Sequence, residues 1–151
     1  MDAAEFAALV PELDVADLAR SRTFYVDLVG FTELFGRQHE AFVYLRLGRA
    51  DLMLEQADGP GRRFRTAPLD VPFGRGMNLQ IEHPFLDAAH DRLVAAGADF
   101  IVPLETRIYE TGTTAVSVRQ FVVADPDGYL IRLQQRSSSG PLGRPPDGLA
   151  S

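Results

Sequence analysis

The stretch Asp125-Pro126-Asp127-Gly128-Tyr129-Leu130-Ile131, near the end of the chain, decides the fold. Its first four residues are typical of a tight turn, because proline presets its own backbone angle and glycine accepts the left-handed conformation. Strand-like runs, rich in β-branched and aromatic side chains, lie on both sides of the turn, over residues 115–124 and 129–135. The motif therefore predicts two antiparallel strands that close one half of the chain.

The residues before this hairpin extend it into a larger unit. Residues 78–82 have a strand-like pattern, and a helix follows, opened by Pro84 and ended by Gly97. A short strand over residues 100–102 and a loop rich in threonine and glycine then lead to the hairpin. The second half is therefore predicted to have the element order βαβββ.

The first half of the chain repeats this order. Residues 9–15 alternate as a half-buried strand does, and a helix runs from Asp17, a suitable N-cap, to Gly30. Val15 and Gly30 are 15 residues apart, and Ile81 and Gly97 are 16 apart. We therefore infer a duplicated module. The remaining predicted strands of the first half cover residues 31–35, 42–47 and 51–56.

These patterns predict a single α+β domain over residues 1–136. The first module occupies about residues 6–56 and the second about residues 77–136, and the connector at 57–76 has too many glycines and prolines for regular structure. Residues 137–151 are predicted to be a disordered tail. Two such modules can curl together into a cup, a barrel-like mixed sheet with its helices on the outside.

The composition limits the chemistry. The chain has no cysteine and all 15 basic residues are arginine, which excludes disulfides, thiolate metal sites and lysine-based catalysis. Its net charge of −6 argues against nucleic acid and anionic membranes as partners and favours a cationic ligand. The acidic N-terminus and the lack of a long apolar run predict a cytoplasmic protein. The basic run at residues 62–65 is predicted to be a solvated loop.

With these motifs in view, the chain resembles the vicinal oxygen chelate superfamily, which includes glyoxalase I, extradiol dioxygenases, and fosfomycin and bleomycin resistance proteins. The resemblance covers about residues 6–136 and implies the glyoxalase/bleomycin resistance fold. It rests on Leu13-Asp14-Val15-Ala16-Asp17, Ser21-Arg22-Thr23-Phe24-Tyr25, Leu28-Val29-Gly30-Phe31 and the 125–131 motif. The bleomycin resistance branch is the most similar, through Val10-Pro11-Glu12-Leu13, the 72–78 run and Arg119-Gln120-Phe121.

The resemblance also places the residues that hold a divalent metal in the enzymes of this superfamily. The matching positions here are Val10, Gly76 and Arg132, which cannot serve as metal ligands, and Glu55 is the one carboxylate left. The sequence therefore predicts no metal, no cofactor and no catalytic residue. In place of the metal, Arg132 and Glu55 are expected to pair across the cup.

Resemblance to the bleomycin resistance proteins implies a metal-free homodimer that binds a drug between its two chains. Aromatic walls with a few carboxylates suit a small hydrophobic or cationic ligand. Glu12 and Glu55 either contact that ligand or form structural ion pairs, and the apolar residues either line the pocket or belong to the core. The expected ligand-binding residues are Glu12, Phe42, Tyr44, Asp51, Met53, Glu55, Tyr109 and Arg132.

The leading interpretation is a protein that binds a bleomycin-type antibiotic and confers resistance by sequestration. The alternative is a metal-dependent glyoxalase-like lyase or dioxygenase of the same superfamily, and a third interpretation is an interaction module without a ligand. The arm over residues 1–15 can exchange between subunits of a dimer. His39, His83 and His90 are expected to be surface or capping residues rather than metal ligands.

Overall fold

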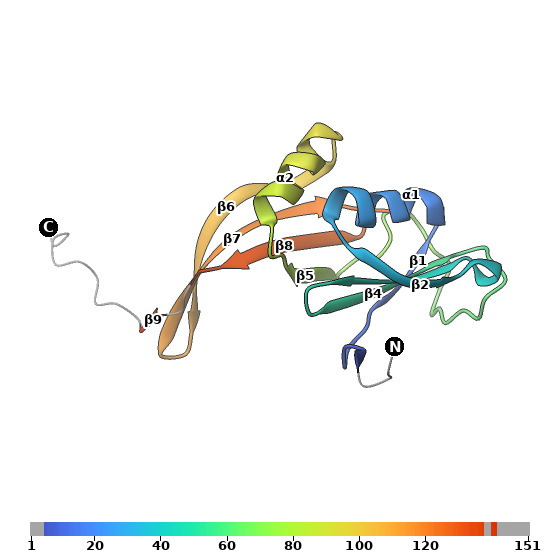
Figure 1. Cartoon of the computed structure of the whole chain (residues 1–151), viewed down its shortest axis with the longest axis horizontal. Helices are drawn as coiled ribbons and strands as arrows, with labels where there is room; N and C mark the ends of the chain where they lie inside the picture. The colour runs from blue at the N-terminus through green and yellow to red at the C-terminus, as the bar shows by residue number, and fades with distance from the viewer. Residues whose placement is uncertain (1–4, 138–139, 142–151) are drawn as a thin grey trace, which may run out of the picture.

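A computed structural model describes residues 5–137 and 140–141 of the chain (Figure 1). The first half consists of β1 (Glu12–Val15), α1 (Leu18–Arg22), the π-helical segment η2 (Thr23–Val29), β2 (Thr32–Arg37), the 3-10 turn η3 (Gln38–Glu40), β3 (Phe42–Leu47) and β4 (Ala50–Gln56). The second half consists of β5 (Asn78–Glu82), α2 (Leu86–Ala95), β6 (Asp99–Thr111), β7 (Thr114–Ala124), β8 (Leu130–Arg136) and β9 (Gly140–Pro141).

The two halves form two sheets with one common strand order. The first sheet has the order β1-β4-β3-β2 and the second β5-β8-β7-β6, with β9 beside β7. In each sheet the first strand of the module runs parallel to the last, and the remaining neighbours are antiparallel. This topology confirms the predicted α+β fold class and its mixed sheets. The sheets remain open and lie beside each other within one chain.

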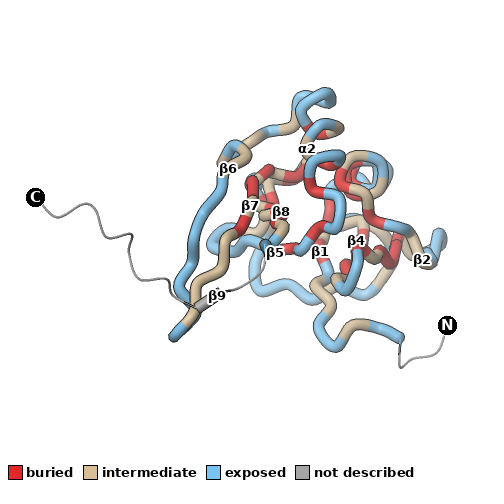
Figure 2. The backbone as a smooth tube through the Cα atoms, turned by 60° about the vertical axis from the view of Figure 1, so that its left-hand side comes forward, coloured by how far each residue is buried: buried red, intermediate tan, exposed pale blue. Residues whose placement is uncertain are grey.

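The core lies between the helices and one face of the two sheets (Figures 1 and 2). Alternate strand residues such as Leu13, Val15, Leu52 and Leu54 turn toward the helices and are almost fully buried. The residues between them turn to the opposite face. We call that opposite face the distal face of each sheet, because the functional residues predicted in β1, β3, β4 and β8 lie on it.

The 125–131 motif joins the two modules. The Asp125 carboxylate accepts hydrogen bonds from the backbone N–H groups of Asp127 and Tyr129, at 2.9 Å each, and from the hydroxyl of Tyr25 at 2.6 Å. Asp127 accepts from the backbone N–H of Ala16 at 3.2 Å. Burial and the charge of Asp125 raise the pKa of Tyr25 well above its ordinary value, so its hydroxyl stays a donor. We call these contacts the inter-module clamp.

Glycines in and near the motif allow two segments to pass closely. Gly128 has a φ of +96°, and a Cβ atom there would lie 2.4 Å from Cβ of Pro72. A Cβ atom on Gly74 would lie 2.3 Å from the ring of Tyr129. Both positions therefore exclude larger residues, and the end of the connector is packed against the turn.

Several predicted elements differ from the observed ones. β6 runs over 13 residues, whereas the sequence predicted a strand over 100–102 followed by a loop. Its outer part pairs with β7 from Glu105 to Thr111, where β-branched and aromatic side chains favour a strand, and Gly112, with a φ of +76°, provides the turn. The predicted first helix is built from α1 and η2, which ends at Gly30 in the left-handed conformation.

The C-terminal tail is described only in part. Residues 138–139 and 142–151 of the predicted disordered segment lie outside the described residues. Within it, the backbone N–H of Ser137 donates to the carbonyl oxygen of Ser117 at 3.0 Å, and β9 pairs with the start of β7. These short pieces therefore extend the second sheet.

Candidate functional site

Most of the predicted ligand-binding residues share the distal face of the first sheet. In register, Glu12 lies beside Met53, Asp14 beside Glu55, and Tyr44 beside Met53. Phe42 pairs with Glu55 on the other side of β4. The strand alternation therefore brings together the carboxylates and aromatic rings that the sequence singled out.

The aromatic part of this face is covered by Phe35 of β2 and by residues 5–11, the described part of the N-terminal arm. Phe35 stacks on Tyr44 with ring centroids 5.0 Å apart, and Phe6 of the arm meets the edge of Tyr44 at 5.1 Å. Phe42 and Tyr44 are therefore only 3% and 5% exposed. Burial, followed by a hydrogen bond to Asp51, raises the pKa of Tyr44 to about 12, which keeps its hydroxyl protonated.

Asp51 holds the arm in place. Its carboxylate accepts hydrogen bonds from the Tyr44 hydroxyl at 2.5 Å, from Nε and Nη2 of Arg46 at 2.7 and 2.8 Å, and from the backbone N–H of Ala7 at 2.9 Å. Arg46, the largest influence, and these hydrogen bonds keep the pKa of Asp51 well below its usual range. Asp51 is thus a structural anion, because its carboxylate is buried and already accepts four hydrogen bonds from the chain.

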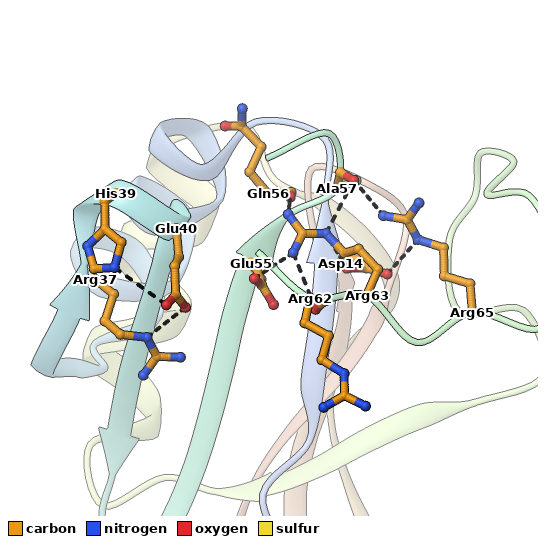
Figure 3. A network of polar contacts seen from close by, with 10 residues as sticks. All are labelled: Asp14, Arg37, His39, Glu40, Glu55, Gln56, Ala57, Arg62, Arg63 and Arg65. Carbon is orange, nitrogen blue, oxygen red and sulfur yellow. Dashed lines mark hydrogen bonds and ion pairs between the residues drawn. The ribbon is translucent and has the colours of Figure 1, made fainter. Parts of the chain in front are cut away.

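Glu55 is covered by the connector (Figure 3). We call residues 59–65 of the connector the strap. Nη1 of Arg63 donates to Oε1 of Glu55 at 2.5 Å, and Nε of Arg65 donates to Oδ2 of Asp14 at 2.8 Å. The side chains of Glu55 and Arg63 are only 6% and 15% exposed. The basic run is a loop with Arg62, Phe64 and Arg65 exposed, as predicted, but Arg63 is folded onto the distal face, which the sequence did not predict.

The strap fits closely over the sheet. A Cβ atom on Gly61 would lie 1.8 Å from Oε1 of Glu55, so no side chain larger than hydrogen fits there without displacing the carboxylate. Arg63 also donates from Nε to the carbonyl oxygen of Ala57 at 3.3 Å and from Nη2 to that of Gln56. Gly61 thus leaves room for the carboxylate of Glu55, and Arg63 binds it.

Glu12 is the carboxylate on this face that no arginine of the described chain contacts within ion-pair distance. Partial burial, then a hydrogen bond to Glu55 and repulsion from Glu55 and Asp14, raise its pKa to about 7, and the charge of Arg63 opposes this shift. Glu12 therefore changes charge near neutral pH.

The strap leaves little room on the distal face. The cavity between Glu12, Asp14, Arg62, Arg63 and Phe64 has a volume of about 100 Å³, whereas sites for drug-sized ligands measure about 300–1,000 Å³. Larger hollows of about 680 and 610 Å³ lie elsewhere, around residues 48–50 and 80–84 and along residues 71–78. None of the eight predicted residues lines either of them.

The other two predicted residues lie on the second sheet. The hydroxyl of Tyr109, on β6, accepts a hydrogen bond from Nε2 of Gln120 at 2.7 Å. Arg132 lies on the distal face of β8, and its buried Nε has no hydrogen-bond partner among the described residues. The predicted pair between Arg132 and Glu55 is not formed, because Arg63 from the strap takes the place beside Glu55.

The residues at the metal positions of the superfamily do not fit a metal. Val10 and Gly76 provide no side-chain donor, and both precede the strands β1 and β5. Arg132 brings a positive charge to the third position. Among the residues that the structure describes, no group of three or more His, Cys, Asp or Glu side chains is placed to hold a metal ion.

Sequence reasoning missed the residues that complete the first distal face: Asp14, Arg46, Gly61, Arg63 and Arg65. Asp14 was visible in the strand alternation, on the same face as Glu12. The strap arginines had no such signal, because contacts between a loop without regular structure and a strand do not follow a sequence period.

Comparison with known proteins agrees with this architecture. TioX from Micromonospora sp. ML1 has 22% sequence identity and a TM-score of 0.65, over 84% of this chain and 96% of that one. A glyoxalase/bleomycin resistance protein from Streptomyces sp. CB03234 has 25% identity and a TM-score of 0.57, over 83% and 97% of the two chains. A glyoxalase/bleomycin resistance protein/dioxygenase from Alicyclobacillus acidocaldarius has 17% identity and a TM-score of 0.58, over 89% and 94%.

The family assignment rests on the sequence itself. A search of the curated proteins finds no significant match. The profile of the Glyoxalase/Bleomycin resistance protein/Dioxygenase superfamily, in contrast, matches residues 9–133. This range covers nearly all of both modules, together with the connector and the inter-module clamp. The chain therefore belongs to the Glyoxalase/Bleomycin resistance protein/Dioxygenase superfamily, as its motifs predicted.

Proposed function

We propose that the protein binds a small hydrophobic or cationic molecule of the bleomycin type on its first distal face, without transforming it, and confers resistance by sequestration. The observation that carries this proposal is the guanidinium group of Arg63, which is held on buried Glu55 beside an aromatic wall. A face that binds a cation of its own chain has the charge and the shape to bind a cation of a ligand.

The strap acts as the internal competitor of this ligand. The cavity of about 100 Å³ beneath it is too small for a drug-sized molecule, so binding requires Arg63 to leave Glu55. The ligand cation then takes over the contact with Glu55, and its apolar part covers Met53 and the edge of the aromatic wall. Glu12, which forms no ion pair with an arginine among the described residues, adds attraction at neutral pH.

The proposal includes a cytoplasmic homodimer, because the two sheets of the chain lie beside each other and do not close into a barrel. A second copy can complete a cup over the distal face of the first sheet and bury a ligand more fully than one sheet does.

Among the described residues no helix is long and apolar enough to cross a membrane.

The test is thermal unfolding with metal-free bleomycin, with benzamidine as a minimal cationic probe, and with divalent metals, because any compound that binds only the folded state raises Tm. We expect a shift with bleomycin and benzamidine. A shift with a metal and none with either cation would contradict the proposal and direct attention to lyase and dioxygenase assays.

Three variants test the site itself. Replacement of Glu12 with Gln should weaken cation binding about tenfold, whereas Glu110→Gln, an exposed carboxylate on β6, should leave the affinity unchanged. Arg63→Met removes the competitor and should strengthen cation binding. Equal loss of affinity in the Glu12 and Glu110 variants would show general charge attraction and not a site.

A further inference from the structure

The distal face of the second sheet contains an arginine that has no counter-ion in the part of the chain that the structure describes. Arg132 lies in β8 between Ile131 and Leu133, which are fully buried on the helix side, so its own side chain lies on the opposite face. Its register neighbours are Gln80 on β5 and Val122 on β7. Nε of Arg132 is buried and meets no acceptor among the described residues.

The carboxylates of the second distal face are already bound by other groups. Glu82, on β5, accepts from Arg49 and Arg136, each at 3.2 Å. Glu105, on β6, accepts from Nε2 of Gln120 at 3.0 Å. None of the ion pairs within residues 5–137 includes Arg132. Within the described residues, the guanidinium of Arg132 is therefore a cation with an unsatisfied donor.

We propose that Arg132 is the anchor of an anion subsite that binds a carboxylate group. The planar fork of a guanidinium matches the two oxygens of a carboxylate, and one such oxygen would satisfy the buried Nε. Gln80, exposed and directly beside Arg132 in register, provides an amide donor for the same group. This subsite goes beyond the proposed function, because it lies on the other sheet and takes the opposite charge.

The carboxylate can come from a small molecule or from an acidic side chain of a second copy of the chain. Both sources present the same chemistry to Arg132. They differ in their dependence on protein concentration, because only the second copy is diluted together with the protein.

The direct readout is the side-chain Nε–H signal of Arg132 in a ¹H–¹⁵N spectrum, assigned by its loss in Arg132→Gln. Sodium acetate is the probe, and sodium chloride at the same ionic strength is the reference. We expect acetate to move the signal along a saturating curve and chloride to leave it in place. An equal response to both salts, or no response to acetate, would overturn the proposal.

A matched variant separates the subsite from general charge attraction. Arg107, on β6 of the same sheet, is exposed and forms no ion pair among the described residues. Backbone amide signals of β5 and β8 should report acetate binding about tenfold weaker in Arg132→Gln and unchanged in Arg107→Gln. Equal weakening in both variants would refute a specific subsite.

Two further measurements identify the source of the carboxylate and check that the variant folds. An Nε–H signal that moves on dilution without acetate, in step with the sedimentation coefficient, assigns the carboxylate to a second copy. A signal that is constant on dilution assigns it to a small molecule. Arg132→Gln should stay folded, which thermal unfolding checks, because the substitution removes a buried donor without an acceptor. Failure of benzamidine to bind would affect the proposed function alone.

Discussion

The two sheets have the same strand order but differ in the charged residues of their distal faces. On the distal face of the first sheet, Asp51 is bound by Arg46, and Glu55 by Arg63 of the strap. On the distal face of the second sheet, Arg132 has no counter-ion within the described part of the chain. The first face is thus completed by its own chain, through the arm and the strap, whereas the second is left with an unsatisfied charge.

This difference shows what a duplicated module fixes and what it leaves free. The strand order and the side of the helices are common to both halves, because the buried positions set them. The distal positions carry no such constraint, so the two modules of one chain can have opposite charges on their distal faces. Substitutions that remove a charge should therefore have opposite consequences on the two faces.

The largest effect is expected for Asp51→Ala on the first face. The substitution leaves Arg46 and the Tyr44 hydroxyl without their buried acceptor and releases the arm, so stability should fall by about 4 kcal/mol. Urea unfolding measures the change. Asp27→Ala, on the exposed side of η2, is the control and should change stability by less than about 0.5 kcal/mol. Similar values for both variants would refute the structural role of Asp51.

Arg63→Met should have the next largest effect. Glu55 would remain buried without a partner, and stability should fall by about 3 kcal/mol. Glu55→Gln in the same chain removes the unpaired charge and should restore about 2 kcal/mol of that loss. A double-mutant cycle by chemical denaturation provides these values. Strictly additive effects of the two substitutions would mean that the strap does not interact with Glu55.

Arg132→Leu on the second face should behave differently. It removes a buried donor that has no acceptor, so stability should stay the same or rise by up to about 1 kcal/mol. The same urea experiment measures it without added ligand. A loss as large as that of Arg63→Met would show that Arg132 has a partner within the chain and would remove the contrast between the faces.

The smallest effect is expected from the titration of Glu12. Its pKa is raised in the folded state, to about 7, so the folded chain binds more protons than the unfolded one between the two pKa values. Stability should therefore fall as pH rises through that window, by less than about 1 kcal/mol because Glu12 is exposed to screening solvent. Glu12→Gln should show a flatter pH profile of Tm between about pH 5 and pH 8. Identical pH profiles of Tm for the two proteins would contradict the raised pKa of Glu12.

The sequence predicted the parts of the molecule that follow a period or a motif. Alternation over residues 9–15 predicted the first strand and the face on which Glu12 lies, and the 125–131 turn was recognised from Asp125 and Gly128. The superfamily and the element order followed from these signals.

The partners of the site residues could not be predicted in the same way. The pair of Glu55 with Arg63 depends on how a loop of glycines and prolines crosses the sheet, and Gly61 shows its function only when the atoms above Glu55 are known. The position of Tyr109 was missed as well, because the length of β6 is set by pairing with β7 and not by its own pattern. Long-range contacts, not local propensity, decide these features.

The inter-module clamp also has a consequence for how the protein is made. Tyr25 and Asp125 are 100 positions apart, and ribosomes add about 5–20 residues per second, so the hydroxyl of Tyr25 waits roughly 5–20 s for its acceptor to be synthesised. During that time α2 of the second module is synthesised and can pack against η2, but the first helix still lacks the 125–131 turn. The nascent first half therefore exposes apolar surface until the 125–131 turn has been synthesised and the inter-module clamp can form.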